Sequence, residues 1–175
     1  MNFYFNLLIA VIILPIFITF FFIIALIIFL FDGFPILYKD KRLGLNYKII
    51  KIYKFRTMKN QKLNYKLLEK NSDFNRVTKI GFFLRKTSLD EIPQILNIFM
   101  GDMSFVGPRP LPISYKEYIV KNFHKRCSVK PGITGLTQIK GRNKLSWKRR
   151  FHYDNFYIIK DHLCLIYLFY LKLFY

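Results

Sequence analysis

The most prominent pattern along the chain is an N-terminal stretch, Phe3–Phe31, in which no side chain is charged. Only Tyr4, Asn6 and Thr19 are polar within it. A helix of about 20 apolar residues crosses the hydrocarbon core of a bilayer, and helices of soluble proteins rarely stay apolar on every face over such a length. The stretch therefore predicts a helix embedded in a membrane rather than one buried in a soluble core.

Pro15 divides this stretch into Phe3–Leu14 and Ile16–Phe31. A proline removes a backbone donor and crowds the residue four positions earlier. At about 1.5 Å per residue, each half is short for a hydrocarbon core about 30 Å thick. Two geometries follow: a kinked helix that spans the bilayer, or a re-entrant helix whose ends return to one side. In both, the positive-inside tendency places the basic remainder of the chain in the cytoplasm.

Shorter patterns follow the apolar stretch. Alternating basic and apolar residues around a turn predict a β-hairpin within Tyr38–Met58, and the polar segment Asn60–Arg76 predicts a loop or a short helix. Apolar residues at helical spacing predict three helices, one from near Ser88 to Gly101, one over Pro112–Arg126 and one from Ser146 through Ile158. The apolar segment Leu163–Tyr175 is too short to span a membrane, so we expect it to pack on the domain or lie in the membrane interface.

Composition narrows the class of protein. The chain has 175 residues, and 29 Lys and Arg against 10 Asp and Glu give a net charge of +19. A hydrophobic content of 53% excludes a disordered polar chain. The two cysteines, Cys127 and Cys164, form no CxxC motif, which excludes a disulfide scaffold and fits a reducing compartment. The length favours a single domain.

The segment Arg85–Glu91 places two adjacent acids beside two basic residues. Ser88 and Glu91 have the spacing of a helix capping box, and acids in a first turn favour the helix dipole, so an ordinary helix start also fits. Pro93 would remove a bond from such a helix, which favours an irregular turn that places Asp90. A carboxylate held by an arginine stays ionised and can serve as a nucleophile or a metal ligand.

Two turn-rich segments carry further basic residues. Within Gly101–Pro110, the rigid Pro-Arg-Pro presents Arg109, whose guanidinium suits two-point contact with phosphate, although such a fragment alone is commonly a surface loop. Within Pro131–Asn143, three glycines allow close backbone approach, and Lys140 and Arg142 add charge that would suit a diphosphate. The glycine spacings match neither a Walker loop nor a dinucleotide motif.

Together these segments resemble the bacterial sugar transferase family, the small monotopic phosphoglycosyl transferases. The resemblance runs along nearly the whole chain and is carried, in order, by the apolar stretch with its central proline, Lys54–Met58 (KFRTM), Leu84–Gln94, Gly101–Pro110 and Pro131–Asn143. One departure is Leu14 before the proline, where the family often has a serine whose hydroxyl would satisfy a freed carbonyl.

The resemblance implies an enzyme that transfers a sugar-1-phosphate from a UDP-sugar to polyprenyl (undecaprenyl) phosphate and releases UMP, the first membrane step of bacterial glycan assembly. In this family an Asp-Glu dyad works with Mg²⁺, and the Asp forms an aspartyl phosphosugar-enzyme intermediate. By position, the resemblance implies Asp90 as the nucleophile and Glu91 as its partner, both of them as ligands of Mg²⁺.

The resemblance also implies a set of substrate-binding residues. Arg85 would hold the nucleophilic carboxylate, while Arg109 and Arg142 would hold substrate phosphate or nucleotide. Arg56 and Asp154 match polar positions that line the same site.

The expected fold is mainly α with a small β-hairpin, in the α+β class. The resemblance implies that residues 1–31 form a re-entrant membrane helix, and we expect residues 32–175 to form a compact cytosolic catalytic domain with interfacial amphipathic helices. The chain matches the family's minimal form. The expected location is the cytoplasmic face of the bacterial inner (plasma) membrane. The expected partners are the UDP-sugar, the polyprenyl phosphate lipid, the membrane and downstream glycosyltransferases, but no nucleic acid.

Two alternatives stay open. A membrane-tethered basic module that binds anionic polymers, nucleic acid or lipid headgroups would explain the charge and the interleaved aromatic residues, but not the acids of the Asp-Glu dyad. Such a module would tolerate Asp90→Asn. A transferase in which the lipid phosphate attacks the sugar nucleotide directly would use the same substrates and differ only in its kinetics.

Overall fold

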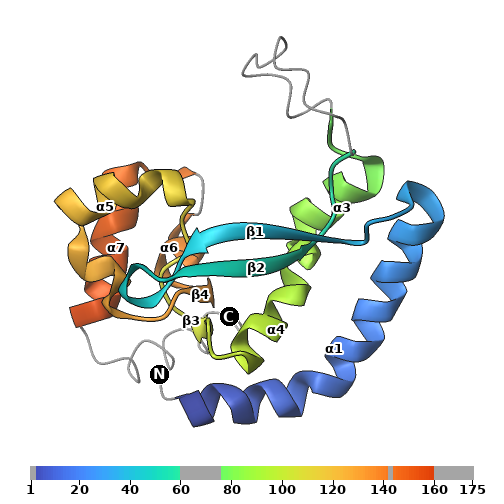
Figure 1. The fold of residues 1–175 in the computed structure, drawn as a ribbon, viewed down its shortest axis with the longest axis horizontal. Coiled ribbons are helices and arrows are strands. Elements are labelled where there is room, and N and C mark those ends of the chain that lie inside the picture. The colour runs from blue at the N-terminus through green and yellow to red at the C-terminus, as the bar shows by residue number, and fades with distance from the viewer. Residues whose placement is uncertain (1–2, 60–75, 142–143, 160–175) are drawn as a thin grey trace. The chain divides into compact units, whose positions relative to one another are not determined.

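The fold is taken from a computed structural model that describes residues 3–59, 76–141 and 144–159 (Figure 1). The described elements are mainly helices, with two small two-stranded sheets, which confirms the predicted fold class. Contacts between residues divide them into two compact units. The first unit draws on the described residues within Met1–Ile12, Asp40–Ile52 and Gln94–Tyr175, and the second unit on those within Ile13–Lys39 and Tyr53–Pro93.

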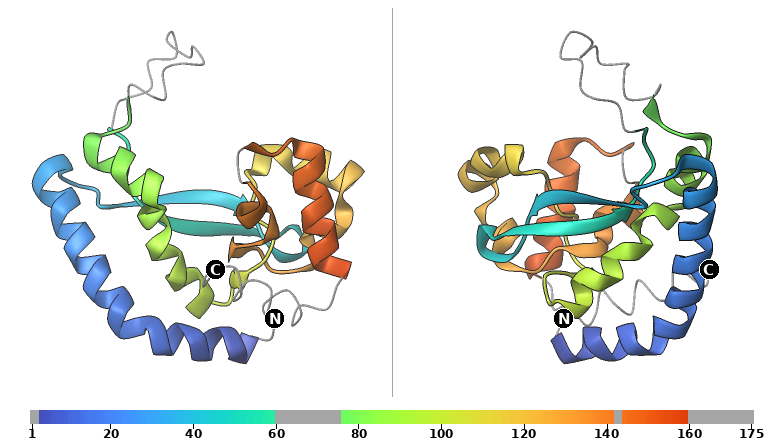
Figure 2. Two further views of the ribbon diagram at one scale, coloured as in Figure 1. Left: turned by 180° about the vertical axis from the view of Figure 1, so that it is seen from behind. Right: turned by 45° about the vertical axis from the view of Figure 1, so that its right-hand side comes forward.

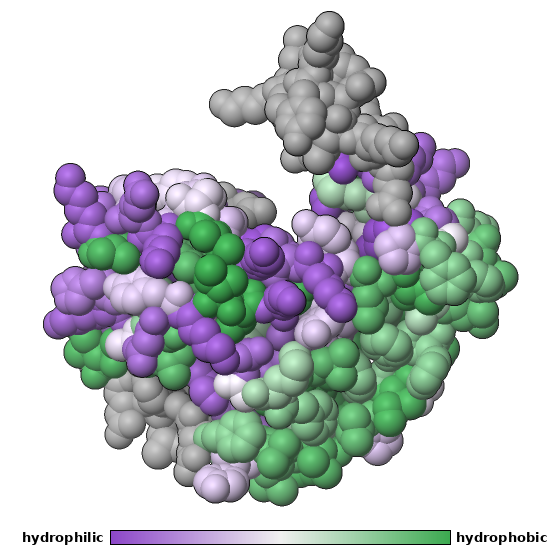
Figure 3. Space-filling view, viewed as in Figure 1, coloured by the Kyte–Doolittle hydropathy of each residue, from purple (hydrophilic) through white to green (hydrophobic). Residues whose placement is uncertain are grey.

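Helix α1 spans Phe3–Asp32 and continues through Pro15. The Thr19 hydroxyl donates to the carbonyl oxygen of Pro15 at 3.0 Å. Most side chains of α1 are exposed, and Figure 3 shows hydrophobic side chains gathered over this helix. Among the described residues, α1 is the one helix long and apolar enough to cross a membrane. The long apolar helix is therefore confirmed, while its re-entrant path and the domain boundary after residue 31 stay predictions.

The predicted hairpin is confirmed. Strand β1 (Leu37–Leu43) pairs with strand β2 (Ile49–Phe55), and the 3-10 turn η1 (Leu45–Tyr47) connects them. Asn46 and Tyr47 have positive φ angles of 49° and 62°, which give the chain its sharp reversal at this turn. The KFRTM segment (Lys54–Met58) begins in the last two residues of β2 and continues beyond the strand.

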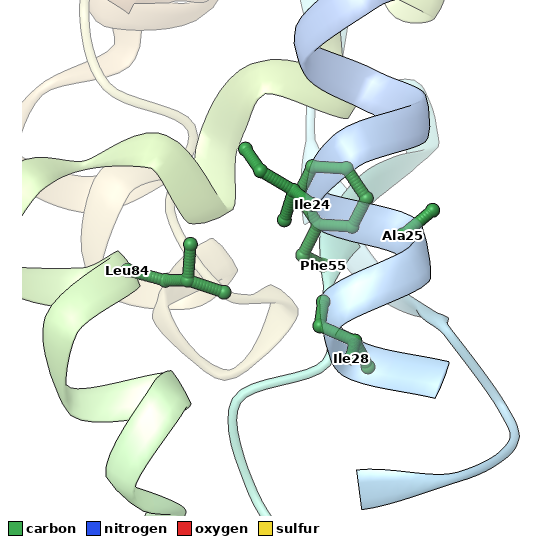
Figure 4. Close-up of a cluster of buried hydrophobic side chains, with 5 residues drawn as sticks. All are labelled: Ile24, Ala25, Ile28, Phe55 and Leu84. Carbon is green, nitrogen blue, oxygen red and sulfur yellow. The ribbon is translucent and has the colours of Figure 1, made fainter. Parts of the chain in front are cut away.

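The second unit is held by an apolar cluster that Figure 4 shows in close-up. The cluster combines side chains from three elements. Helix α1 contributes Ile24, Ala25 and Ile28, which lie on one face of the helix, strand β2 contributes Phe55, and helix α3 (Lys79–Thr87) contributes Leu84. Helix α3 begins at the N-cap Thr78, whose side chain accepts a hydrogen bond from Gly81 N at 2.9 Å. Neither α3 nor its cap was predicted from the sequence.

The continuous helix expected from Ser88 to Gly101 is wrong in form. Ser88 has a left-handed φ of 62° and ends α3, and the chain then forms the 3-10 helix η3 (Leu89–Gln94) and the short helix α4 (Ile95–Phe99). Pro93 has no N–H to donate to the carbonyl of the residue four positions earlier, which disfavours an α-helical turn here and agrees with the observed 3-10 geometry. The expected irregular turn is therefore confirmed.

The other helix predictions are borne out in part. The helix expected over Pro112–Arg126 is broken into η4 (Ile113–Tyr115), α5 (Lys116–Asn122) and η5 (His124–Ser128), because Phe123 has non-helical backbone angles. The last predicted helix is present as α7 (Trp147–Ile159), and Ser146 Oγ accepts from Arg149 N at 3.4 Å. The predictions for residues 60–75 and 163–175 lie outside the described residues.

Part of the core of the first unit is one mixed aliphatic and aromatic cluster. Its buried members are Leu43, Leu111, Ile119, Cys127 and Phe151. Ile119 of α5 and Phe151 of α7 share this cluster, and the two helices lie side by side in Figure 2. Burial raises the pKa of the Cys127 thiol, so this cysteine packs as a neutral group.

A short parallel sheet joins the two turn-rich segments of the first unit. Strand β3 (Ser104–Val106) pairs with β4 (Gly132–Thr134), with Ser104 opposite Gly132. A Cβ placed on Gly132 would lie 2.1 Å from Gly107 N, so only glycine permits this approach of the two backbones. Gly132 and Gly107 thus allow two backbone segments of this chain to pack closely against each other. Helix α6 (Leu136–Lys140) follows β4, and neither α6 nor this sheet was predicted.

Two side chains hold β3 from outside its sheet. Asn6, a buried polar residue of α1, accepts through Oδ1 from Ser104 Oγ at 3.0 Å and from Phe105 N at 2.9 Å. The Tyr157 hydroxyl of α7 donates to the carbonyl of Val106 at 2.9 Å. The strand that leads into the Pro-Arg-Pro segment is therefore bonded to α1, β4 and α7.

The close contact of the two turn-rich segments can be tested with Gly132→Ala. The added methyl would collide with the backbone at Gly107, so we expect a loss of about 1–3 kcal/mol in the free energy of unfolding. Denaturant unfolding in detergent, followed by the fluorescence of Trp147, measures it. Ile133→Val in the same strand is the control, at about 0.5–1 kcal/mol. Equal losses in both variants would contradict the steric argument.

The buried hydroxyl of Tyr157 makes a prediction about alkaline pH. Burial raises its pKa to about 12 from 10.0, so between these values the unfolded chain has lost the proton while the folded chain keeps it. Stability should therefore fall as the pH rises through this window. Tyr157→Phe should cost about 1 kcal/mol at pH 8 and make that fall shallower, as measured by melting at pH 8 and 11. The exposed Tyr118→Phe is the control, and an unchanged pH dependence in Tyr157→Phe would refute the assignment.

Candidate functional site

The acidic pair lies in the tight turn of the second unit. Asp90 and Glu91 are the first acidic residues of η3, directly after the left-handed Ser88. Asp90 is 8% exposed, and the side chain of Glu91 is 12% exposed. The two adjacent residues are therefore largely shielded from solvent, unlike acids on a fully solvated helix face.

Lys54 of β2 pairs with this turn. Its Nζ lies 2.7 Å from Glu91 Oε1, and the two side chains are 18% and 12% exposed. Opposite charges shielded from solvent interact more strongly than a surface pair does. Sequence reasoning missed Lys54 as a site residue, and the signal that could have found it is its place at the head of the KFRTM segment.

Arg85 connects α3 to the KFRTM segment. It is exposed, and its Nε donates to Thr57 Oγ1 at 2.8 Å. Thr78 N donates to the carbonyl of Thr57 at 3.1 Å, and a Cβ on Gly81 would lie 2.1 Å from that oxygen. The start of α3 therefore rests on the backbone of Thr57. The expected contact of Arg85 with Asp90 stays a prediction, because the bond that the structure gives Arg85 is to Thr57.

Arg56 is buried and binds the end of α1. Its guanidinium donates to the carbonyl oxygens of Asp32, Gly33 and Phe34, and the last two distances are 2.7 Å. The carbonyls at a helix C-terminus have no partners within the helix, and a buried guanidinium satisfies them. The Asp32 side chain in turn accepts from Thr78 Oγ1 at 2.8 Å. The expected substrate contact of Arg56 stays a prediction beside this structural role.

The remaining expected site residues belong to the first unit. Arg109 is exposed between two buried prolines. Asp154 is 4% exposed, and its carboxylate accepts from Arg126 Nε and from Thr137 Oγ1, both at 2.8 Å. Arg142 lies outside the described residues. The structure thus groups Arg56, Arg85, Asp90 and Glu91 in one unit, and Arg109 and Asp154 in the other.

The carboxyl groups of Asp90 and Glu91 fit a magnesium ion. Mg²⁺ commonly takes one or two protein carboxylates and completes its shell with water and substrate phosphate. A self-sufficient cage is not part of this arrangement, since the described residues contain no cluster of three or more His, Cys, Asp or Glu. Asp90 and Glu91 are the residues that would hold such an ion, and this metal site stays a prediction.

Comparison with known proteins decides the family. The model of the bacterial sugar transferase family matches residues 1–172. This chain belongs to the bacterial sugar transferase family. The predicted resemblance is confirmed, and the match covers both compact units of this sugar transferase.

Relatives of this sugar transferase carry related names. It is 44% identical over 126 residues to the uncharacterized sugar transferase EpsL of Bacillus subtilis. This match covers 72% of this chain and 61% of the relative. It is 42% identical over 132 residues to the UDP-glucose:undecaprenyl-phosphate glucose-1-phosphate transferase of Klebsiella pneumoniae, and this match covers 71% of this chain and 28% of the relative. For the undecaprenyl-phosphate galactose phosphotransferase of Salmonella typhimurium the identity is 39% over 142 residues, covering 73% and 30%. The chain thus spans less than two thirds of each of these relatives.

The shielded pair of Lys54 and Glu91 can be tested by Lys54→Met. Removing the ammonium leaves the Glu91 carboxylate half-buried beside an apolar group, so we expect a loss of about 1–3 kcal/mol in the free energy of unfolding. Lys54→Arg should recover part of the loss. The control is the exposed Lys59→Met, which should change stability by less than about 0.5 kcal/mol. The prediction fails if both Met variants unfold at the same denaturant concentration.

Proposed function

We propose that this sugar transferase moves a sugar-1-phosphate from a UDP-sugar to polyprenyl phosphate, releases UMP and passes through an aspartyl phosphosugar-enzyme intermediate. The observation that carries the proposal is the shielded Asp90–Glu91 pair in a chain whose family match covers residues 1–172. The names of two relatives, from Klebsiella pneumoniae and Salmonella typhimurium, support the substrate class.

The first step is an attack by a carboxylate oxygen of Asp90 on the sugar-bearing phosphorus of the UDP-sugar. A bond forms between this oxygen and the phosphorus, while the bond from the phosphorus to the bridging oxygen breaks. The bridging oxygen and its electron pair leave as part of UMP, and the enzyme holds an acyl phosphate with the sugar attached. Splitting one displacement into two lets a water-soluble and a lipid substrate use the same site in turn.

The second step regenerates the enzyme. An oxygen of polyprenyl phosphate attacks the phosphorus of the phosphosugar, and the bond from the phosphorus to Asp90 breaks. The carboxylate leaves with the electron pair of that bond, and the product is a polyprenyl diphosphate sugar. No net proton change is needed when both phosphates react as anions.

The basic residues would oppose the charge of the substrates. Arg109 and Arg142 would bind phosphate or nucleotide, because a guanidinium donates to two phosphate oxygens at once. Lys54 would hold Glu91 in place beside Asp90. Mg²⁺, held by Asp90 and Glu91, would neutralise charge on the transferring phosphoryl group.

The membrane and the lipid substrate fit the same scheme. Helix α1 supplies an apolar segment near the N-terminus, and we propose that it is re-entrant with both ends on the cytoplasmic face of the inner membrane. The net charge of +19 would attract both an anionic leaflet and an anionic sugar nucleotide. Downstream glycosyltransferases would extend the lipid-linked sugar.

The deciding experiment measures UMP release by detergent-solubilised enzyme with Mg²⁺, a panel of UDP-sugars and polyprenyl phosphate. We expect Asp90→Asn to lower the rate by about 10³-fold or more, because the amide is not a nucleophile. Glu117→Gln, a change of an exposed acid in α5, is the matched control and should keep the wild-type rate. The sugar that supports turnover identifies the donor.

A second measurement separates the covalent route from its alternatives. Without polyprenyl phosphate, wild-type enzyme should release about one UMP per molecule, and its intact mass should rise by that of the phosphosugar. Direct attack by the lipid would give no UMP until the lipid is added. Full activity of Asp90→Asn would exclude Asp90 as the nucleophile, and UMP release with none of the UDP-sugars would overturn the proposed donor class.

A further inference from the structure

A buried polar chain runs through the first unit and ends on the backbone of Arg109. Thr137 of α6 donates to Asp154 Oδ1 of α7, and Arg126 Nε of η5 donates to Asp154 Oδ2, both at 2.8 Å. Arg126 Nη2 then donates to the carbonyl oxygen of Arg109 at 2.5 Å. Asp154 and Arg126 are 4% and 8% exposed. The chain thus connects three elements to the middle of the Pro-Arg-Pro segment.

We propose that Arg126 and Asp154 are positioning residues for Arg109. They fix the backbone of the Pro-Arg-Pro segment so that the exposed side chain of Arg109 has one direction. This inference rests on the proposed function, in which Arg109 binds phosphate. It gives Asp154 a role through the protein rather than in contact with substrate.

The burial and bonding of the pair support this role. Each carboxylate oxygen of Asp154 already accepts a hydrogen bond from the protein, and the residue is almost fully shielded from solvent. A buried carboxylate would also repel a phosphate. The Arg126 guanidinium lies 5.7 Å from the ring centre of Phe151, which covers it from another side. The carboxylate of Asp154 is therefore bound within the protein rather than presented to a dissolved substrate.

The backbone of the Pro-Arg-Pro segment explains why one hydrogen bond to Arg109 matters. The prolines restrict their own φ angles, and Pro110 also restricts the residue before it. The carbonyl of Pro108 accepts from Gly132 N at 3.0 Å, and that of Pro110 accepts from Arg42 Nη1 at 3.4 Å. The bond from Arg126 fixes the carbonyl between them, so all three carbonyl directions are set.

Only an arginine can make both contacts of Arg126. Its rigid guanidinium donates to Asp154 from Nε and to the Arg109 carbonyl from Nη2. A lysine at this position keeps the charge but has a single ammonium for the two acceptors. Arg126→Lys is therefore a small change that releases the segment while leaving the charge opposite Asp154 in place.

The test is a double-mutant cycle on the KM and kcat of UMP release, with UDP-sugar varied and polyprenyl phosphate saturating. The four enzymes are wild type, Arg126→Lys, Arg109→Ala and the double variant. We expect Arg126→Lys to raise the KM for UDP-sugar about 10-fold in the wild-type background and less than about 2-fold in the Arg109→Ala background. Asp154→Asn, which keeps an oxygen to accept from Thr137, should behave as Arg126→Lys does.

Stability is controlled by Ile119→Ala. This change opens a cavity in the core cluster of the same unit without touching the polar chain, so it should lower the melting temperature and leave KM unchanged. A rise in KM in this control equal to that of Arg126→Lys would overturn the inference. Asp154→Asn provides the measurement if Arg126→Lys does not fold.

The outcomes separate this inference from the proposed function. If the KM effects of Arg126→Lys and Arg109→Ala multiply in the double variant, Arg126 does not act through Arg109 and the inference fails alone. If Arg109→Ala changes neither KM nor kcat, the phosphate-binding role of Arg109 fails and takes the inference with it. A 10-fold effect that disappears without the Arg109 side chain supports the positioning role.

Discussion

The hydrogen bond from a buried guanidinium to a backbone carbonyl is the interaction on which the irregular parts of this protein depend. Arg56 donates to the last carbonyl of α1, at Asp32, and to the two carbonyls that follow it, and Arg126 donates to the carbonyl of Arg109. Neither segment can satisfy these oxygens through regular secondary structure, because one is a helix end and the other is rich in proline. Part of the strong basic charge of the chain therefore serves its own backbone.

Burial divides the arginines expected at the site into two kinds. Arg85 and Arg109 are exposed, as a group that meets a dissolved phosphate must be. Arg56 is 7% exposed and bonded to the end of α1. Residues of a shared motif can thus have different tasks, since Arg56 binds the end of α1, Thr57 accepts from Arg85 of α3 and Lys54 pairs with Glu91. The KFRTM segment therefore makes structural contacts within the protein through Lys54, Arg56 and Thr57.

Local patterns made the fold partly predictable. The apolar helix, the hairpin and α7 each have a period and an end signal within one segment, and they are present. The β3–β4 pair was missed because three-residue strands next to glycine have no period and find each other across the sequence. Of the site, the acidic pair was visible as a motif, whereas the contact of Lys54 with Glu91 joins residues far apart and needs the tertiary fold.

Asn6 makes α1 more than an attachment to a lipid layer. Its Oδ1 gives β3 two hydrogen bonds, so part of the first unit is completed by a side chain from the apolar helix. A chimera that replaces this helix with a foreign anchor of equal length and hydrophobicity would still reach the membrane. It would also lose an acceptor that the strand before the Pro-Arg-Pro segment uses, so the apolar helix and the first unit are not separable modules.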